Sequence, residues 1–192
     1  MNDSELIKRL CARDEGAFRE IVDKYKTLVY NACYHILQNR TEAEDISQEV
    51  FIEVYESIDK FRNESKLSTW LYRISINKSL NHYRKFKWKS VINSIDNFSG
   101  NNSNQKIIEI EDKNANNSPY SIEYKERNQV LQKAINSLSE NQRIAFTLSK
   151  FEELPYKQIS EIMNLSLSSV ESLIHRAKTN LQKKLVNYYK MI

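Results

Sequence analysis

The scarcity of chain-breaking residues is the strongest constraint on this fold, because 192 residues contain only two glycines and two prolines. Hairpins and tight turns between strands depend on these residue types, whereas long helices exclude them. Hydrophobic residues make up 40% of the chain, which is enough to build real cores. The composition therefore predicts an all-α protein with one large domain or two small ones.

Three segments in the N-terminal half carry apolar residues at helical spacing. Helices are expected over Ala17–Leu37, Glu42–Ile58 and Leu67–Phe86, with Thr41 as the N-cap of the second. Every fourth residue of the second segment is apolar: Ile46, Val50, Val54 and Ile58. One apolar face on each helix indicates a compact bundle.

Residues 91–120 differ in character from the segments on either side. They include eight asparagines and four serines, and their hydrophobic periodicity is weak. Such a segment cannot bury enough apolar surface to offset its ordering entropy, so a flexible linker is expected here. The predicted domains are therefore residues 1–90 and residues 121–192.

The C-terminal domain has the layout of a helix-turn-helix. The expected helices cover Ile122–Ile135, Ser139–Phe151, Tyr156–Met163 and Ser168–Val186. Ser139 with Gln142, and Ser168 with Glu171, have the spacing of a capping box. A short helix, a tight turn and a long helix form the arrangement that places the long helix in the major groove of DNA.

The last predicted helix separates into a buried and an exposed face. The buried face would hold Val170, Ile174, Ala177 and Leu181. The exposed face would hold Ser168, Ser169, Glu171, Ser172, His175, Arg176 and Thr179. In a major groove, Arg reads guanine and Glu accepts a hydrogen bond from cytosine. His175 is either part of this DNA-reading face or an ordinary surface histidine.

The charges of the N-terminal domain fall into two consecutive blocks. Seven acidic residues and no Lys or Arg lie between Thr41 and Asp59, whereas nine basic residues and one Glu lie between Lys60 and Ser90. The acidic block is either a solvated helix face or a docking face for a basic partner. A metal or catalytic site is disfavoured there, because the block has neither a histidine nor a second helix with carboxylates.

Aromatic side chains alternate with the cations of the basic block. They are Phe61, Trp70, Tyr72, Tyr83, Phe86 and Trp88. This mixture suits single-stranded nucleic acid, because cations meet phosphates while aromatic rings stack on unpaired bases. Some of these rings must belong to the core, and Trp70 is expected to pack inward with Leu71 and Ile74.

Several classes of function find no support in the residues. Cys11 and Cys33 lack partners at disulfide or zinc spacing, so free thiols are expected. No phosphate-binding loop is visible, and neither a catalytic residue, a metal, a cofactor nor a small-molecule substrate is predicted. No secretion signal or apolar stretch of membrane length occurs, so a soluble, cytosolic protein is expected.

Three segments resemble conserved regions of a known family. They are AEDISQEVF at Ala43–Phe51, DKFRNESKLSTWLYRISINKSLNHYRK at Asp59–Lys85 and LPYKQISEIMNLSLSSVESLIHRAK at Leu154–Lys178. The first two are similar to region 2 of the sigma-70 family, and the third is similar to region 4. With only these regions and a linker, the chain resembles the small extracytoplasmic-function (ECF) sigma factors. The resemblance implies a region 2 helical bundle in residues 1–90 and a four-helix region 4 domain in residues 121–192.

The resemblance also implies a role for each surface. The acidic helix would dock on the clamp of the largest polymerase subunit through Asp45, Gln48, Glu49 and Glu53. The −10 element would be recognised and melted by Phe61, Arg62, Asn63, Ser65, Lys66, Trp70, Arg73, Asn77 and Arg84. The −35 element would be bound by Lys157, Ser168, Ser169, Glu171, Ser172, His175, Arg176 and Lys178.

On this basis the chain is expected to be a non-enzymatic alternative sigma factor, cytoplasmic and associated with the nucleoid when active. The implied partners are the β and β′ subunits of core RNA polymerase, duplex promoter DNA, its single-stranded non-template strand, and a membrane-bound anti-sigma factor. Many family members have basic residues at the positions of Glu171 and Leu173, so the −35 sequence stays open. The alternative is a helix-turn-helix regulator that binds duplex DNA without core polymerase.

Overall fold

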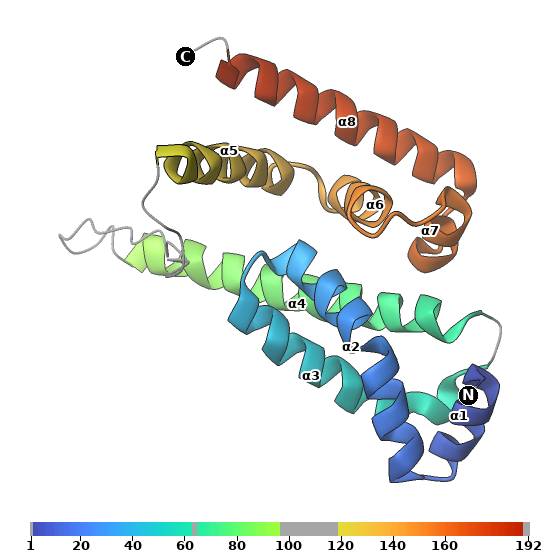
Figure 1. Ribbon diagram of the computed structural model, residues 1–192. Coiled ribbons are helices and arrows are strands. Elements are labelled where there is room, and N and C mark those ends of the chain that lie inside the picture. Colours follow the sequence, from blue (N-terminus) through green and yellow to red (C-terminus); the bar gives the residue numbers. More distant parts are fainter. Residues whose placement is uncertain (1, 63–64, 97–118, 190–192) are drawn as a thin grey trace. The chain divides into compact units, whose positions relative to one another are not determined.

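The computed structural model describes residues 2–62, 65–96 and 119–189 (Figure 1). Every regular element within these ranges is a helix. The chain divides into two compact units, one built mainly from its N-terminal part and one mainly from its C-terminal part. These features confirm the predicted all-α fold with two small domains.

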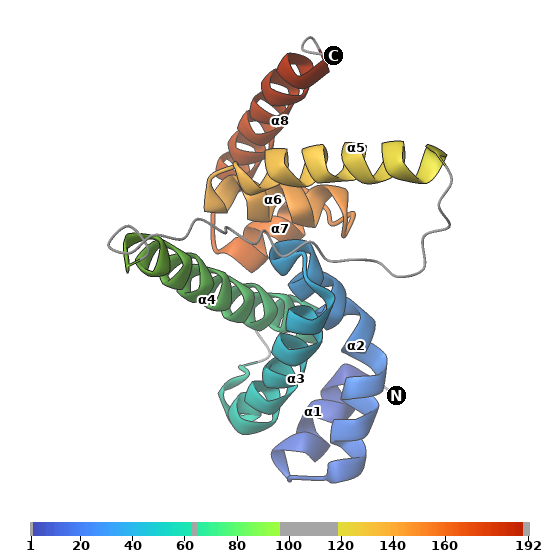
Figure 2. The same ribbon diagram turned by 90° about the vertical axis from the view of Figure 1, so that its left-hand side faces the viewer.

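The helices of the N-terminal unit share one hydrophobic core. They are α1 (Asp3–Cys11), α2 (Glu15–Leu37), α3 (Arg40–Ser57), the 3-10 turn η1 (Ile58–Lys60) and α4 (Leu67–Asp96). The helix α2 packs against both α3 and α4, and Figure 2 shows these three helices side by side. In α3, the predicted core residues Ile46, Val50 and Val54 are at most 4% exposed, which confirms the periodicity argument.

The start of α3 corrects the predicted cap. The helix begins at Arg40, and its N-cap is Asn39 rather than Thr41. The Asn39 side chain accepts a hydrogen bond from the backbone N–H of Glu42 at 3.2 Å, which satisfies a donor of the first turn. Because an Asn two residues upstream caps the helix, Thr41 lies inside the first turn and is exposed.

The helix α1 is an element that the hydrophobic pattern did not predict. Its nine residues bury only Leu6, Ile7 and Leu10, which is too short a pattern to separate a helix from a loop. Polar contacts with α2 help to hold it in place. Lys24 donates a hydrogen bond to Asp3 at 2.6 Å, and the Tyr25 hydroxyl donates to the same carboxylate at 2.7 Å.

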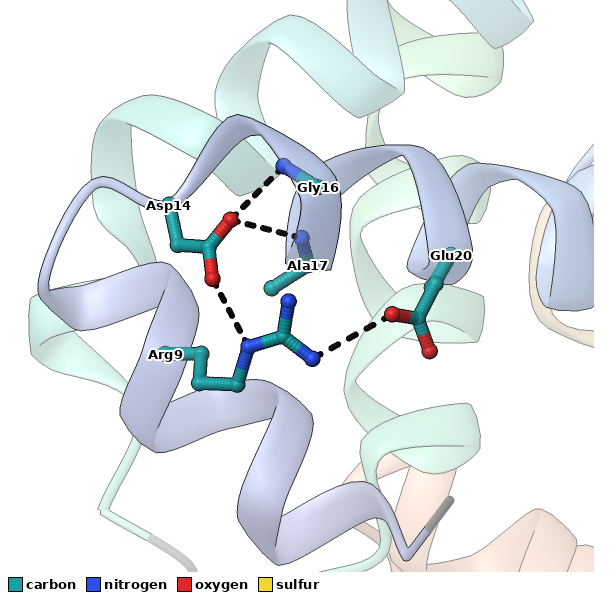
Figure 3. Close-up of polar contacts among 5 residues, drawn as sticks. All are labelled: Arg9, Asp14, Gly16, Ala17 and Glu20. Atoms are coloured by element: carbon teal, nitrogen blue, oxygen red, sulfur yellow. Dashed lines mark hydrogen bonds and ion pairs between the residues drawn. The ribbon is translucent and has the colours of Figure 1, made fainter.

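A second polar cluster joins the end of α1 to the start of α2 (Figure 3). Asp14 is the N-cap of α2 and accepts from the backbone N–H groups of Gly16 at 2.7 Å and Ala17 at 3.2 Å. Its other oxygen accepts from Arg9 at 2.7 Å, and Arg9 also donates to Glu20 at 3.2 Å. The hydrogen bond from Arg9, with those from the backbone, lowers the pKa of the Asp14 carboxyl.

Replacing Asp14→Asn should therefore lower stability in a pH-dependent way. A carboxyl whose pKa is lowered by folding stabilises the folded chain above its ordinary value of 3.8, and this stabilisation disappears as the pH falls through the folded value. Asn still caps the helix but cannot form the ion pair with Arg9. We expect the midpoint of thermal unfolding to fall by a few degrees at pH 7, and the difference from wild type to vanish in acid.

Circular dichroism melts between pH 7 and pH 2 would measure this effect. The matched control is Glu44→Gln, which removes one negative charge from an exposed side chain that forms no ion pair with any described residue. If the midpoints of thermal unfolding of Asp14→Asn and wild type differ by the same amount at every pH, the assignment of the ion pair is wrong.

The C-terminal unit contains α5 (Pro119–Asn136), α6 (Glu140–Lys150), α7 (Tyr156–Met163) and α8 (Leu167–Tyr189). Buried side chains of α5 and α8, among them Ile135 and Leu181, form one hydrophobic cluster of this unit, and α6 also packs against α8. The chain turns between α7 and α8 at Asn164, whose φ of 53° lies in the left-handed region that Asn tolerates. The predicted short helix, turn and long helix are confirmed, and the turn sets the direction in which α8 leaves.

Two predicted capping boxes do not form. Ser139 is the N-cap of α6, but its side chain accepts no capping hydrogen bond. At α8, Ser166 rather than Ser168 has the capping role, because its hydroxyl accepts from the backbone N–H of Ser169 at 3.2 Å. The helix therefore begins at Leu167, one residue before the predicted start.

Most of the predicted linker falls at positions 97–118, which lie outside the described residues. The two ends of the predicted segment are helical, because α4 extends to Asp96 and α5 begins at Pro119. The flexible linker between the two domains stays a prediction.

Candidate nucleic-acid interface

An exposed ridge runs along α3 on the side opposite its buried face. Asp45, Gln48 and Glu49 are exposed on this ridge, whereas Glu53 at its border is half-buried. The ridge also contains Ile52, whose side chain is 56% exposed. We call Asp45, Gln48, Glu49 and Ile52 the α3 ridge.

Ile52 was missed as a candidate, although the sequence contained a signal for it. The buried residues of α3 recur at Ile46, Val50 and Val54, and Ile52 does not share their face. An isoleucine among exposed carboxylates is an apolar contact surface that the fold itself does not use.

A lysine of α4 partly neutralises this side of α3. Lys78 lies 3.1 Å from a carboxylate oxygen of Glu53 and 3.6 Å from one of Glu49. Farther along, His82 of α4 lies 3.1 Å from Glu42. Asp45 forms no ion pair with any described residue, so its carboxylate is the most available of the acidic candidates.

The aromatic residues of the basic block separate into core and surface groups. Tyr72 is 4% exposed and belongs to the core, whereas Phe86 is 51% exposed. The rings of Phe61 and Trp70 lie 5.2 Å apart between centroids, and both pack against the N-terminal core. The expectation that Trp70, Leu71 and Ile74 pack inward is confirmed, with Trp70 half-buried and the other two buried.

The remaining −10 candidates lie on two elements. Arg62 and Lys66 are exposed on the loop before α4, where Ser65 is half-buried and Asn63 falls outside the described residues. Along α4, Arg73 is half-buried, and Asn77 and Arg84 are exposed. The exposed Asn81 lies one turn after Asn77, so this face of α4 carries amides and a cation together.

The faces of α8 agree with the sequence-based assignment. Val170, Ile174, Ala177 and Leu181 are at most 5% exposed. On the other face, Ser169 and Thr179 are half-buried rather than exposed as predicted. The remaining candidates are exposed: Ser168, Glu171, Ser172, His175, Arg176 and Lys178. Lys157 at the start of α7 is also exposed. This pattern leaves the first turns of α8 open to contact with a major groove.

The described residues give no support for a metal site, a reactive cysteine or a membrane span. They contain no group of three His, Cys, Asp or Glu side chains that could hold a metal ion. Cys11 is exposed and Cys33 is buried, and both are free. Burial raises the pKa of the Cys33 thiol and so disfavours its reactive thiolate form. No helix in the described ranges has both the length and the hydropathy that a membrane span requires.

Comparison with protein-family models shows which family this chain belongs to. Residues 21–89 match the model of Sigma-70 region 2, and residues 128–181 match that of Sigma-70, region 4. Together the two models cover more than half of the chain, in the order that the resemblance implied. The chain belongs to the sigma-70 family.

Relatives place this sigma factor in the ECF group. It is 34% identical over 180 residues to the ECF RNA polymerase sigma factor SigW of Bacillus subtilis, covering 93% of this chain and 94% of that protein. It is 29% identical over 184 residues to the ECF RNA polymerase sigma-E factor of Escherichia coli K12, covering 96% and 94%. These relatives confirm the interpretation of the chain as an alternative sigma factor that directs RNA polymerase. They favour it over the alternative, a regulator that acts without polymerase.

A solved structure agrees with this sigma-factor fold. The sigma factor RpoE of Bartonella quintana, crystallised with the anti-sigma factor NepR, has a TM-score of 0.60 at 22% identity. The alignment covers 88% of this chain and 96% of that one. At this level of identity the likeness supports the fold alone.

Proposed function

We propose that this sigma factor docks on core RNA polymerase through the α3 ridge. The clamp coiled coil of the polymerase β′ subunit, which the family uses for docking, is basic, and Asp45 and Glu49 offer it complementary charge. Such complementarity speeds and orients association. Ile52 would add apolar area at the centre of the contact. Glu53 is a weaker candidate, because it is half-buried and paired with Lys78.

The loop after η1 and the exposed face of α4 would capture and hold the melted −10 element. Arg62 and Lys66 would meet phosphates of the non-template strand, while Asn63 and Asn77 would contact unpaired bases. The rings of Phe61 and Trp70 pack against each other and against the N-terminal core, and they would support this surface from the core side. Binding to flipped bases would supply the free energy of melting, which costs a few kcal/mol for each base.

The exposed face of α8 would read the −35 element. Ser168, Glu171, Ser172 and His175 lie near the helix start, which is the part that reaches base edges in helix-turn-helix proteins. Lys157 and Lys178 would contact phosphates of the DNA backbone, and Ser169 and Arg176 would contribute at the edge of the groove.

We place region 2 in residues 1–90 and region 4 in residues 121–192. The segment between them begins with the end of α4 and finishes with the start of α5, and we propose that it serves as a flexible linker between these two helices. Linking two weak DNA contacts raises the effective concentration of each at the promoter. A flexible Asn- and Ser-rich segment between α4 and α5 would allow the two domains to reach two promoter elements at once.

In this proposal the chain catalyses no reaction, and nucleotide addition belongs to the β and β′ subunits of the polymerase. The protein would act in the cytoplasm and associate with the nucleoid when active. A membrane-bound anti-sigma factor would hold it inactive by covering the α3 ridge. The complex of the similar sigma factor RpoE with the anti-sigma factor NepR supports this type of partner.

The matches to region 2 and region 4 models carry the proposal, and run-off transcription tests it directly. Purified protein, core polymerase and a library of genomic promoter fragments should yield discrete transcripts, and core polymerase alone should yield none from the same fragments. If the protein binds fragments but directs no start site, the proposal is wrong and the helix-turn-helix regulator takes its place.

A further inference from the structure

The exposed face of α8 contains a carboxylate that the fold does not use. Glu171 is exposed, and its side chain has no ion pair or hydrogen bond with any described residue. The positions four residues before and after it are Leu167 and His175, so no Lys or Arg lies at the spacing that stabilises a helix.

The helix dipole does not explain Glu171 either. Acidic residues stabilise a helix within its first turn, where the backbone N–H groups are unpaired. Glu171 is the fifth residue of α8, and the first turn has no acidic residue. Stability of α8 therefore supplies no reason for a carboxylate at this position.

The charges along α8 separate into two halves. From Leu167 to His175 the only charged side chain is Glu171, whereas the stretch from Arg176 to Lys184 has four cations and no carboxylate. The cations suit phosphates, which repel a carboxylate. In the first half of the helix, the carboxylate and the lack of cations therefore disfavour contact with phosphates and favour contact with base edges.

An exposed leucine reinforces this division. Leu167, the first residue of α8, is 46% exposed and lies one turn before Glu171. An apolar side chain gains nothing from a phosphate, but it does gain from the methyl group of thymine. Leu167 and Glu171 are therefore two neighbouring side chains that can contact DNA favourably only at bases.

We propose that Glu171 selects an amino-bearing base, cytosine, in the major groove of the −35 element. The carboxylate accepts a hydrogen bond from the N4 amino group of cytosine. The guanine edge presents only acceptors, N7 and O6, and would repel it. This inference rests on the proposed function, because it takes α8 as the helix that reads the −35 element.

A selection experiment with the full chain tests this specificity. Templates would combine a promoter active in run-off transcription with a randomised −35 region, and transcribed templates would be sequenced. Wild type with core polymerase should enrich cytosine over guanine about tenfold at one position. Glu171→Gln should shift that position to adenine, because an amide pairs with N6 and N7, and Glu171→Lys should shift it to guanine.

The controls separate this inference from the proposed function. Glu153→Gln removes an exposed carboxylate from the turn before α7 and should leave the selected sequence unchanged. Identical −35 preferences for wild type and Glu171→Gln would overturn the role of Glu171 while leaving the sigma function intact. A guanine preference in wild type at the position that Glu171→Gln alters would also overturn it. Failure of wild type to transcribe any template would overturn the proposed function itself.

Discussion

Reversing Asp45→Lys together with Glu49→Lys should reduce the affinity for core polymerase by about 100-fold, which corresponds to about 3 kcal/mol. Both side chains are exposed on the α3 ridge, so their replacement leaves the core intact. The variant would present two like charges to a basic clamp. Glu49→Lys removes the 3.6 Å pair of Glu49 with Lys78, but Glu53 keeps its 3.1 Å pair with that lysine, and the core between α3 and α4 is unchanged.

The affinity is best measured by titrating labelled protein with core polymerase at two salt concentrations. Salt shortens the screening length and weakens attraction between opposite charges, so the affinity of wild type should fall with salt more steeply than that of the variant. Glu5→Lys with Asp23→Lys is the matched control, because it makes the same change in net charge at exposed positions of α1 and α2. Unchanged affinity in the Asp45 and Glu49 variant would exclude the α3 ridge as the docking surface.

Replacing Ile52→Ser in the same assay would separate the apolar part of the contact from its charges. Ile52 is 56% exposed, so the change leaves the core of the unit intact. Full burial of an isoleucine contributes about 1.5 to 3 kcal/mol, and only the exposed 56% of Ile52 remains to be buried on docking. The affinity should therefore fall by about tenfold, with little change in salt dependence.

Replacing Leu71→Ala should destabilise the N-terminal unit by about 2 to 5 kcal/mol. Leu71 is fully buried in α4, within the core that α2 and α3 complete. Truncation removes apolar burial and leaves a cavity that packed helices fill only in part. Because domains are stable by only about 5 to 15 kcal/mol, this single change would remove a large share of the total.

Urea unfolding followed by tryptophan fluorescence isolates this effect, because both tryptophans of the chain, Trp70 and Trp88, belong to α4. Asn81→Ala is the control on the same helix, since Asn81 is exposed and its loss should cost less than about 0.5 kcal/mol. A loss below about 1 kcal/mol for Leu71→Ala would mean that the unit relaxes around the cavity more than a packed core allows.

The sequence predicted the long helices and their buried faces well. Periodicity identified the buried residues of α3 and α8, including Val50 and Ile174, because a helix repeats the same face every 3.6 residues. The sequence also separated the acidic block at residues 41–59 from the basic block at residues 60–90, because this separation depends only on the order of charged residues along the chain. Family comparison then agreed with the motifs that these helices contain.

The sequence predicted the helix ends and the partners of charged groups less well. Asn39 and Ser166 cap their helices in place of Thr41 and Ser168, because neighbouring polar residues compete for the same backbone donors. The helix α1 escaped detection, because three buried residues make too short a pattern.

By itself, the sequence determined that this protein is helical, where its long helices lie and which face of each is apolar, because these properties repeat within a single helix. Only the tertiary structure decided that Lys78 pairs with Glu49 and Glu53, that Tyr72 is core while Phe86 is exposed, and that Ile52 stays uncovered. Each of these outcomes depends on which side chain of another helix lies opposite. That choice is made by packing between residues far apart in the chain, and no local pattern encodes it.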